Sequence, residues 1–438
     1  MGNARKFVVK LLTKLDVNSS YSNILLDDAL EKSQLDLQEK KFASALFYGV
    51  LERRLTLDEI IKMYSNNPTN KLSSEVRNIL RIGIYQLLYM DSVPDNAAVD
   101  ECVKLAKKNR NPAVPGFVNG LLRNFIRADK KLPSSDDKLK ELSLKYSCPL
   151  WLVRKWNEEY GHDVCIDLLQ SSIGQAPTSL RINTVYYSME STLEMLSKDG
   201  VTYEINHDLE NSVNVHFNRG VEHTEAFRKG RFHVQDLSSQ LCCSALDPQE
   251  NETVLDLCSA PGGKTFTIAE MMNNTGTVYA FDLHNNRVKL IDFGTRRLGL
   301  KNVKAKVNNA KIFNSEMPLA DRILCDVPCS GLGVIRRKPE IKYKDLEDFK
   351  RLPDIQFEIL STSSKYLKPG GILVYSTCTV SKAENDQVVE KFIAENPDFK
   401  PCPLGPSFGD DSDFTRVTIT PSKYNSDGFF IAKFMRQR

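Results

Sequence analysis

Short apolar runs, each followed by a turn or a polar residue, mark the C-terminal half of the chain. They occupy residues 254–257, 277–281, 322–325 and 372–375. Runs of this length that contain β-branched residues are typical of buried parallel strands, and stretches with helical spacing separate them. The alternation lasts from about Phe232 almost to the end. It predicts an α/β domain with a doubly wound, Rossmann-like parallel sheet.

Residues up to about 130 follow a different pattern. Apolar residues recur there at helical spacing, as in 30–51 and 76–88. Segments 92–95 and 109–112 interrupt the spacing with proline and polar residues. This part of the chain is therefore predicted to be an all-helical bundle.

A polar linker at 131–137 follows the bundle and leads to a small α+β insert. Strand-like runs at 178–184 and 213–216 flank a helix at 188–196. A chain of 438 residues agrees with two or three domains, because single hydrophobic cores rarely grow larger. We expect a helical domain at 1–132, linker helices with the insert at 133–228, and the α/β domain at 229–438.

Composition is that of an ordinary folded protein, with 41% hydrophobic and 26% charged residues. No apolar run approaches the roughly 20 residues that cross a membrane, and the first residues carry no secretory apolar stretch. We expect a cytoplasmic protein without a membrane partner. The ten cysteines include no C-x-x-C pair, so neither a zinc site nor a redox dithiol is indicated. We expect free thiols and no metal, and nothing demands more than a monomer.

Net charge is only +3, which by itself predicts no nucleic-acid partner. One stretch of the helical domain is nevertheless strongly basic and is opposed only by Asp129. Its basic residues are Lys104, Lys107, Lys108, Arg110, Arg123, Arg127, Lys130 and Lys131. Charge runs are usually solvated faces, but an excess this one-sided favours a contact with nucleic acid.

The predicted strands end in polar groups of chemical interest. In open α/β sheets, ligands bind beyond the carboxyl ends of the strands. Asp282 and Asp326 end two strands, and Cys329 and Cys378 follow closely after two. With the turn 258–264, these groups should converge on one cleft. We expect an active site in which cysteine is the nucleophile.

The turn after the first of these strands opens a helix. Its residues are Cys258, Ser259, Ala260, Pro261, Gly262, Gly263 and Lys264. The glycines let a ligand approach the backbone, and the helix N-terminus offers unpaired N–H groups. Asp282 lies 19 residues beyond Gly263, close to the spacing at which an acidic residue binds ribose hydroxyls. A nucleoside cofactor is indicated. A P-loop remains an alternative, although this chain has Cys258 at the position where a P-loop has its first glycine.

Asp326 can be a helix cap with no further role. A carboxyl group among apolar strands holds its proton more readily, because desolvation disfavours the charged form. We expect a neutral Asp326, which is both a hydrogen-bond donor and an acceptor. That pattern suits cytosine, whose ring N3 accepts and whose amino group donates, whereas uracil presents the reverse.

A free cysteine is usually a small buried hydrophobe. We interpret in that way Cys242, Cys243 and Cys325. Cys329 and Cys378 differ because both lie at the sheet edge that carries Asp326. Carbon 5 of cytosine is a poor nucleophile, but addition of a thiolate at carbon 6 makes it an enamine-like carbon that can take a methyl group from a sulfonium. The two thiols therefore fit covalent catalysis.

Together these residues resemble the RNA cytosine-C5 methyltransferases that use S-adenosylmethionine, a likeness that covers nearly the whole chain. It rests on segments 258–265, 326–331 and 375–379. The resemblance implies that S-adenosylmethionine is the cofactor, that Cys378 is the nucleophile and that Cys329 helps to release the product. DNA cytosine methyltransferases attack with their Pro-Cys cysteine, so the presence of both cysteines points to RNA.

The N-terminal helices resemble the RNA-binding fold of the antitermination factor NusB, through segments 97–106 and 116–123. This combination resembles the bacterial 16S ribosomal RNA cytosine-C5 methyltransferases of the RsmB/NOP family. It implies that the basic segment 336–342 meets RNA phosphates. Where the family has an aspartate near the adenine, this chain has Asn309, which can still hydrogen-bond a base.

A non-catalytic RNA-binding ribosome-assembly factor is the alternative from another class. It requires a degenerate cofactor pocket, whereas the glycines, both aspartates and both cysteines are present. The sequence leaves open which cytosine is modified, and whether the substrate is free RNA or an assembling small subunit.

Overall fold

The computed structural model describes residues 4–17, 22–65, 71–217, 220–409 and 413–437. The chain forms two compact units. The first contains the chain up to Gly174 together with Ile335–Lys344, and the second contains Gln175–Val334 and Asp345–Arg438. The C-terminal half of the sequence therefore contributes one segment, Ile335–Lys344, to the first unit.

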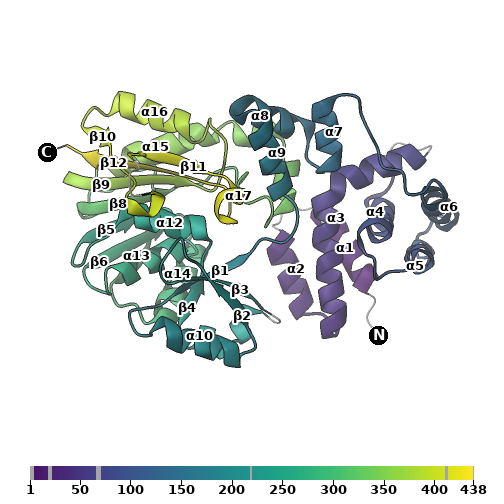
Figure 1. The fold of residues 1–438 in the computed structure, drawn as a ribbon, viewed down its shortest axis with the longest axis horizontal. Coiled ribbons are helices and arrows are strands. Elements are labelled where there is room, and N and C mark those ends of the chain that lie inside the picture. The colour runs from purple at the N-terminus through teal and green to yellow at the C-terminus, as the bar shows by residue number, and fades with distance from the viewer. Residues whose placement is uncertain (1–3, 18–21, 66–70, 218–219, 410–412, 438) are drawn as a thin grey trace. The chain divides into compact units, whose positions relative to one another are not determined.

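All regular elements among the described residues of the first unit are helices, as the apolar spacing predicts (Figure 1). Its α-helices are α1 (Ala4–Val17), α2 (Ser22–Glu31), α3 (Leu37–Tyr64), α4 (Ser74–Tyr89), α5 (Asp95–Ala106), α6 (Val114–Arg127), α7 (Lys138–Lys145), α8 (Leu150–Tyr160) and α9 (His162–Ser171). Polar side chains cap the N-termini of some of these helices. Asp36 accepts a hydrogen bond of 2.8 Å from the Glu39 amide at the start of α3, and Asp137 caps α7.

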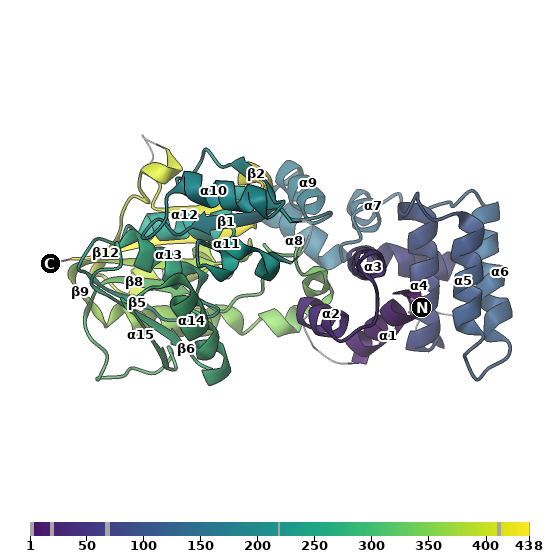
Figure 2. The same ribbon diagram turned by 90° about the horizontal axis from the view of Figure 1, so that it is seen from below.

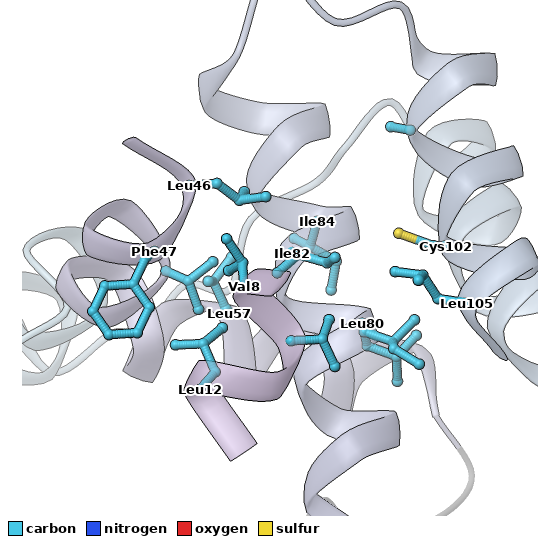
Figure 3. Close-up of a cluster of buried hydrophobic side chains, with 14 of the residues drawn as sticks. Val8, Leu12, Leu46, Phe47, Leu57, Leu80, Ile82, Ile84, Cys102 and Leu105 are labelled. Atoms are coloured by element: carbon cyan, nitrogen blue, oxygen red, sulfur yellow. The ribbon is translucent and has the colours of Figure 1, made fainter. Parts of the chain in front are cut away.

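One apolar core holds α1 and α3 to α6 together. Figure 2 shows α4, α5 and α6 side by side, and Figure 3 shows side chains of the core pointing toward one another. Those labelled in Figure 3 are Val8, Leu12, Leu46, Phe47, Leu57, Leu80, Ile82, Ile84, Cys102 and Leu105. Burying one such side chain contributes about 1.5–3 kcal/mol. Tertiary packing therefore stabilises these helices more than intrinsic propensity does.

The segment Ile335–Lys344 is embedded in this helical unit. It contains the short 3₁₀ helix η3 (Pro339–Tyr343), and Glu340 accepts hydrogen bonds from the amide and the hydroxyl of Ser22 at 3.0 and 2.7 Å. Lys342 is 0% exposed and donates to the Glu52 carbonyl at 2.7 Å. The expectation that the basic segment meets RNA phosphates is therefore wrong for Lys342, because its ammonium group is used inside the protein.

The second unit begins with a small antiparallel sheet in the order β2-β3-β1-β4. Its elements are β1 (Thr178–Ile182), α10 (Met189–Lys198), β2 (Thr202–Ile205), β3 (Ser212–His216), η2 (Val221–His223), α11 (Glu225–Arg228) and β4 (Phe232–Val234). The predicted α+β insert is present. Phe232, however, pairs with Ile182 of β1 and does not begin the large sheet as expected. Apolar periodicity predicts a strand but does not identify its partner.

The large sheet has the order β10-β12-β9-β8-β5-β6-β7, and β11 pairs with β12. Its strands are β5 (Thr253–Asp256), β6 (Thr277–Asp282), β7 (Val303–Val307), β8 (Ala320–Asp326), β9 (Leu367–Thr377), β10 (Phe399–Pro401), β11 (Arg416–Ile419) and β12 (Phe429–Arg436). β5 to β9 are parallel, as predicted. β12 is antiparallel to β9, and β10 and β11 are antiparallel to β12, so the sheet is mixed rather than wholly parallel.

Helices cover both faces of the large sheet, which confirms the doubly wound arrangement (Figure 1). The helices of the second unit are α12 (Leu237–Leu246), α13 (Gly263–Met271), α14 (Asn285–Leu298), η4 (Leu346–Phe349), α15 (Leu352–Ser364), α16 (Asp386–Glu395), η5 (Pro406–Phe408) and α17 (Pro421–Tyr424). Val374 of β9 packs in the core with α12 and α13, while its neighbour Tyr375 packs in the core with α15 and α16. Such alternation is typical of a strand buried on both faces.

The strand register aligns the ends that carry the predicted site. Asp326 lies opposite Ser376 of β9, and Asp282 lies opposite Val307 of β7. β5 lies between β8 and β6. The carboxyl ends of these strands therefore meet at one edge, where ligands bind in folds of this kind.

Candidate active site

A cavity of about 210 Å³ opens at the carboxyl ends of β5 and β8. Asp256 and Asp326 contribute carboxyl groups to its lining. The rest of the lining is Val234, Gln235, Asp236, Ser239, Cys258, Ser259, Ala260, Pro261, Gly263 and Lys264. The structure thus brings Asp326 together with the whole predicted turn except Gly262.

The glycine turn is tight on one side and open on the other. Gly262 has φ +113°, and a Cβ there would lie 2.4 Å from the Phe266 ring, so that only glycine fits. A Cβ on Gly263 would meet nothing nearer than the Gln235 side chain at 3.8 Å. The start of α13 is therefore accessible from the cavity, as the cradle of a cofactor requires.

Asp282 and Asn309 lie farther along the same sheet edge and are not among the residues that line the cavity. Asp282 forms an ion pair of 3.2 Å with Arg287. Arg287 also donates to the Ala260 carbonyl at 2.7 Å, which connects Asp282 to the glycine turn. The Asn308 amide donates to the Asp282 carbonyl at 3.0 Å, so Asn309 follows directly beside Asp282.

Asp326, at the end of β8, is held by two side chains. Lys264 Nζ donates to one of its oxygens at 2.7 Å, and the Ser376 hydroxyl donates to the other at 2.9 Å. Burial acts to lower the pKa of Lys264, but the adjacent Asp326 charge outweighs burial and the pKa is raised. The apolar surroundings expected for a neutral Asp326 are not found, because its side chain is 26% exposed and paired with a cation.

The environment of a neutral carboxylic acid is found instead at Asp256, on β5. Its side chain is fully buried, and burial raises its pKa to about 7 although Thr265 Oγ1 donates to it at 2.6 Å. Its other oxygen, Oδ1, has no hydrogen-bond partner among the described residues. A buried oxygen at a cavity is satisfied by a ligand that brings a donor. The cavity therefore offers an acceptor oxygen to a ligand that brings a hydrogen-bond donor, such as an ammonium group.

Cys329 and Cys378 face each other with their Sγ atoms 3.1 Å apart. They lie in the loops that follow β8 and β9, and both are free, half-buried thiols. The Gly333 amide donates to the Cys378 carbonyl at 3.0 Å. A Cβ on Gly333 would lie 1.9 Å from the Gly428 carbonyl oxygen, so only glycine allows this approach. The structure thus brings both predicted cysteines to the sheet edge that carries Asp326.

The surroundings of Cys329 keep its thiol protonated. Its hydrogen bond with Cys378, its burial and the charges of Glu384 and Asp326 all raise the pKa of Cys329 well above the ordinary value. A thiol of this kind is a poor nucleophile at neutral pH, because the thiolate is the reactive form.

The cysteines interpreted as core residues are indeed buried. Cys242, Cys243 and Cys325 are all 0% exposed, and burial raises the pKa of Cys242 and of Cys325 to about 12. Within the described ranges, no group of three His, Cys, Asp or Glu side chains is placed to hold a metal ion. No helix in those ranges is long and apolar enough to cross a membrane.

Three family models match the chain in succession. They are the NusB family over residues 2–127, the ferredoxin-like domain of RsmF/B-like methyltransferases over 148–222, and the 16S rRNA methyltransferase RsmB/F over 243–435. A protein of Bacillus subtilis strain 168, named probable ribosomal RNA small subunit methyltransferase B, is 37% identical over 99% of this chain and 99% of its own. The chain belongs to the RsmB/F family of 16S rRNA methyltransferases.

Further similarities extend over the whole RsmB/F chain. Ribosomal RNA small subunit methyltransferase B of Proteus mirabilis strain HI4320 is 32% identical over 98% of both chains. The crystal structure of PH0851 has a TM-score of 0.84 and 26% identity, and it covers 100% of this chain and 99% of its own. These matches confirm the predicted fold, with a NusB-like domain, a small α+β insert and a Rossmann-like methyltransferase domain. They also decide against a P-loop NTPase.

Sequence reasoning missed several residues of the RsmB/F site. They are Gln235, Asp236, Ser239 and Asp256, which line the cavity, and Glu384, which bonds the cysteine loops. Asp256 ends a strand, so the signal that singled out Asp282 and Asp326 could have found it. No local sequence pattern indicates that the remaining residues, Gln235, Asp236, Ser239 and Glu384, lie near the site.

Proposed function

We propose that this RsmB/F protein transfers a methyl group from S-adenosylmethionine to carbon 5 of a cytosine in 16S ribosomal RNA. The observation that carries the proposal is the 3.1 Å approach of Cys329 Sγ and Cys378 Sγ at the sheet edge that also holds the cofactor turn. The relatives named ribosomal RNA small subunit methyltransferase B support the RNA substrate. An enzyme of ribosomal RNA would act in the cytoplasm.

S-adenosylmethionine supplies a methyl group activated on a sulfonium, and it also carries an ammonium group and a ribose. Asp256 Oδ1 would accept a hydrogen bond from the ammonium, and Asp282 would hold the ribose. Asn309 would contact the adenine. The turn residues that would cradle the remainder are Cys258, Ser259, Ala260, Pro261, Gly262, Gly263 and Lys264. Three aspartates, Asp236, Asp256 and Asp326, against one lysine make the cavity suitable for a cation.

In the proposed reaction, the Cys378 thiolate adds to carbon 6 of the cytosine and forms a C–S bond. Electron density then moves toward carbon 5 and N3. Asp326 would contact N3 and the amino group, and the Lys264 cation 2.7 Å away would offset the negative charge at that edge. After carbon 5 has gained the methyl group from the sulfonium, its proton passes to solvent, the C–S bond breaks, and the Cys378 thiolate is released. Cys329 assists this elimination.

The base must leave its stack to reach the cleft, at a cost of a few kcal/mol. Binding of the surrounding RNA would repay that cost, and the basic stretch of the NusB-like domain is suited to it. Lys104 and Lys130 pair with Glu101 and Asp95 at 2.7 and 2.9 Å. The other members stand exposed to solvent; they are Lys107, Lys108, Arg110, Arg123, Arg127 and Lys131. We propose that these side chains contact RNA phosphates.

Two substitutions test the assigned roles. Cys378→Ala should reduce methyl incorporation into 16S rRNA to background, because no carbon–sulfur bond can form. Cys329→Ala should accumulate a covalent RNA–protein complex that survives denaturing electrophoresis, because elimination is blocked. Cys402→Ala is the matched control, since this half-buried thiol of the same unit lies outside the site. Full activity of Cys378→Ala would reject the proposal.

Two further measurements complete the test. Bisulfite sequencing of 16S rRNA from cells with and without the protein should reveal one cytosine whose methylation depends on it. Calorimetry with S-adenosylmethionine should show binding to the wild-type protein. An absence of binding would favour the non-catalytic assembly factor instead.

A further inference from the structure

Glu384 is a buried carboxylate that the proposed reaction does not use. It lies between the loop of Cys378 and α16, and it is 2% exposed. It accepts hydrogen bonds from the Ser330 amide at 2.8 Å and from the Ser330 hydroxyl at 2.6 Å. Because Ser330 directly follows Cys329, both bonds act on the backbone that carries this thiol.

The same carboxylate reaches the second cysteine loop. Thr379, which directly follows Cys378, donates to Glu384 at 3.4 Å, and its hydroxyl lies 2.8 Å from that of Ser330. The Glu384 carbonyl accepts from the Tyr375 hydroxyl at 2.6 Å, so the backbone is anchored to β9 as well. One side chain therefore joins the residues that follow the two cysteines.

Gln356 of α15 completes this arrangement. Its side-chain amide donates at 3.0 Å both to Glu384 and to the Pro328 carbonyl. Pro328 and Ser330 flank Cys329, so the loop is held on both sides of the thiol. A buried carboxylate is costly unless hydrogen bonds satisfy it. Here the satisfying donors come from the two cysteine loops and from α15.

We propose that Glu384 is a positioning residue that sets Cys329 relative to Cys378 during catalysis. The inference rests on the proposed function, because it concerns the same two thiols. Both sulfurs must act on one pyrimidine ring, Cys378 at carbon 6 and Cys329 on the elimination that follows. Misplacing a reacting group by about 1 Å costs on the order of 100-fold in rate. The bonds of Glu384 prevent such a displacement.

Glu384→Gln is the most direct test, because it preserves size and removes the charge. A glutamine has one acceptor oxygen instead of two, so it cannot accept at the same time from the Ser330 amide and Gln356 on one side and from the Ser330 and Thr379 hydroxyls on the other. We expect kcat to fall about 100-fold while the Kd for S-adenosylmethionine stays within about twofold. Glu384→Asp retains the charge and should fall between the wild type and Glu384→Gln.

Glu270→Gln is the matched control. Glu270 is also a buried glutamate of the second unit, 5% exposed, and it lies near His233 and Arg181 rather than near the cysteine loops. Its kcat should stay within about twofold of the wild type. A kcat of Glu384→Gln within that range, or equal losses in both variants, would overturn the inference.

The trapping assay distinguishes this inference from the proposed function. Cys329→Ala alone should form the covalent RNA complex. Glu384→Gln, with Cys329 intact, should also accumulate a detectable fraction of the complex, because a displaced thiol assists the elimination less well. No accumulation above the wild-type level would count against positioning of Cys329 by Glu384. A complete absence of the complex in Cys329→Ala would overturn the proposed function, and kcat would still decide the role of Glu384.

Ser330→Ala provides a second probe if Glu384→Gln does not fold. It removes only the hydroxyl bonds to Glu384 and Thr379, so kcat should fall about tenfold with cofactor binding retained. An unchanged kcat would overturn the inference. Where both variants fold, the double variant should be no slower than Glu384→Gln, because the two substitutions remove the same interaction.

Discussion

Two lysines, one in each unit, have opposite electrostatic environments: the Lys264 side chain is 13% exposed, and Lys342 is 0% exposed. Lys264 stands 2.7 Å from the Asp326 carboxylate, and its pKa is raised although burial alone acts to lower it. Lys342 is fully buried and donates to the Glu52 carbonyl, and burial lowers its pKa to about 8. Burial is common to both, so the partner decides the direction of the shift.

The two lysines differ in what their charges act on: Lys264 faces the cavity, whereas Lys342 faces only the interior of the helical unit. Lys264 lines the cavity, so its charge acts on what binds there. The Lys342 ammonium lies 5.4 Å from the centre of the Tyr343 ring, and its charge acts on the packing of the helical unit. The same substitution at the two positions should therefore change different properties.

Lys264→Met should produce the largest effect. It leaves Asp326 without its cation and removes positive charge from the edge where the base is proposed to bind. We expect methyl transfer to fall about 10³-fold, within the range for groups that stabilise transition-state charge. Initial rates with labelled cofactor and 16S rRNA measure it. Lys342→Met is the matched control and should retain activity. Equal activities of the two variants would contradict the conclusion that only Lys264 acts on the ligand site.

The two lysines also show what the sequence could predict. Lys264 was placed at the cleft because its turn follows an apolar run that reads as a strand, and strand ends collect ligands. Lys342 belongs to a basic segment that looked like a phosphate contact. Only the tertiary structure reveals that Ile335–Lys344 packs inside the helical unit. Local composition carries no information about such a partner.

The same limit applies to the sheet and to the carboxyl groups. Periodicity predicted the strand of Phe232 and the parallel strands β5 to β9, but not that β4 pairs with β1. Strand ends singled out Asp326, yet its ion pair is with Lys264, which is remote in sequence. Glu384 precedes a helix and reads as an ordinary acidic residue near a helix start. Its proposed role depends on the two cysteine loops and α15, which meet only in the fold.

Lys342→Met should have an intermediate effect, on stability rather than on activity. The folded-state pKa of about 8 lies below the ordinary value of 10.5. Between these values the unfolded chain binds more protons than the folded chain, so the free energy of unfolding rises with pH. For the wild type this gain amounts to about 3 kcal/mol over that window. Denaturant titrations at several pH values measure the free energy of unfolding of the wild type and of Lys342→Met. If the two proteins show the same pH dependence, Lys342 does not cause it.

Lys107 and Lys108 give a third environment, exposed on the NusB-like domain, and the smallest expected effect. Each phosphate contact adds about 0.7–0.9 to the slope of log affinity against log salt. Replacing both lysines by alanine should reduce the slope of 16S rRNA binding by about 1–2 and leave kcat unchanged. Lys104→Ala is the control, because Lys104 already pairs with Glu101 at 2.7 Å and should change the slope less. If all three proteins show the wild-type slope in filter binding over a salt series, the RNA contacts a different face, and exposure alone does not turn a lysine into a phosphate ligand.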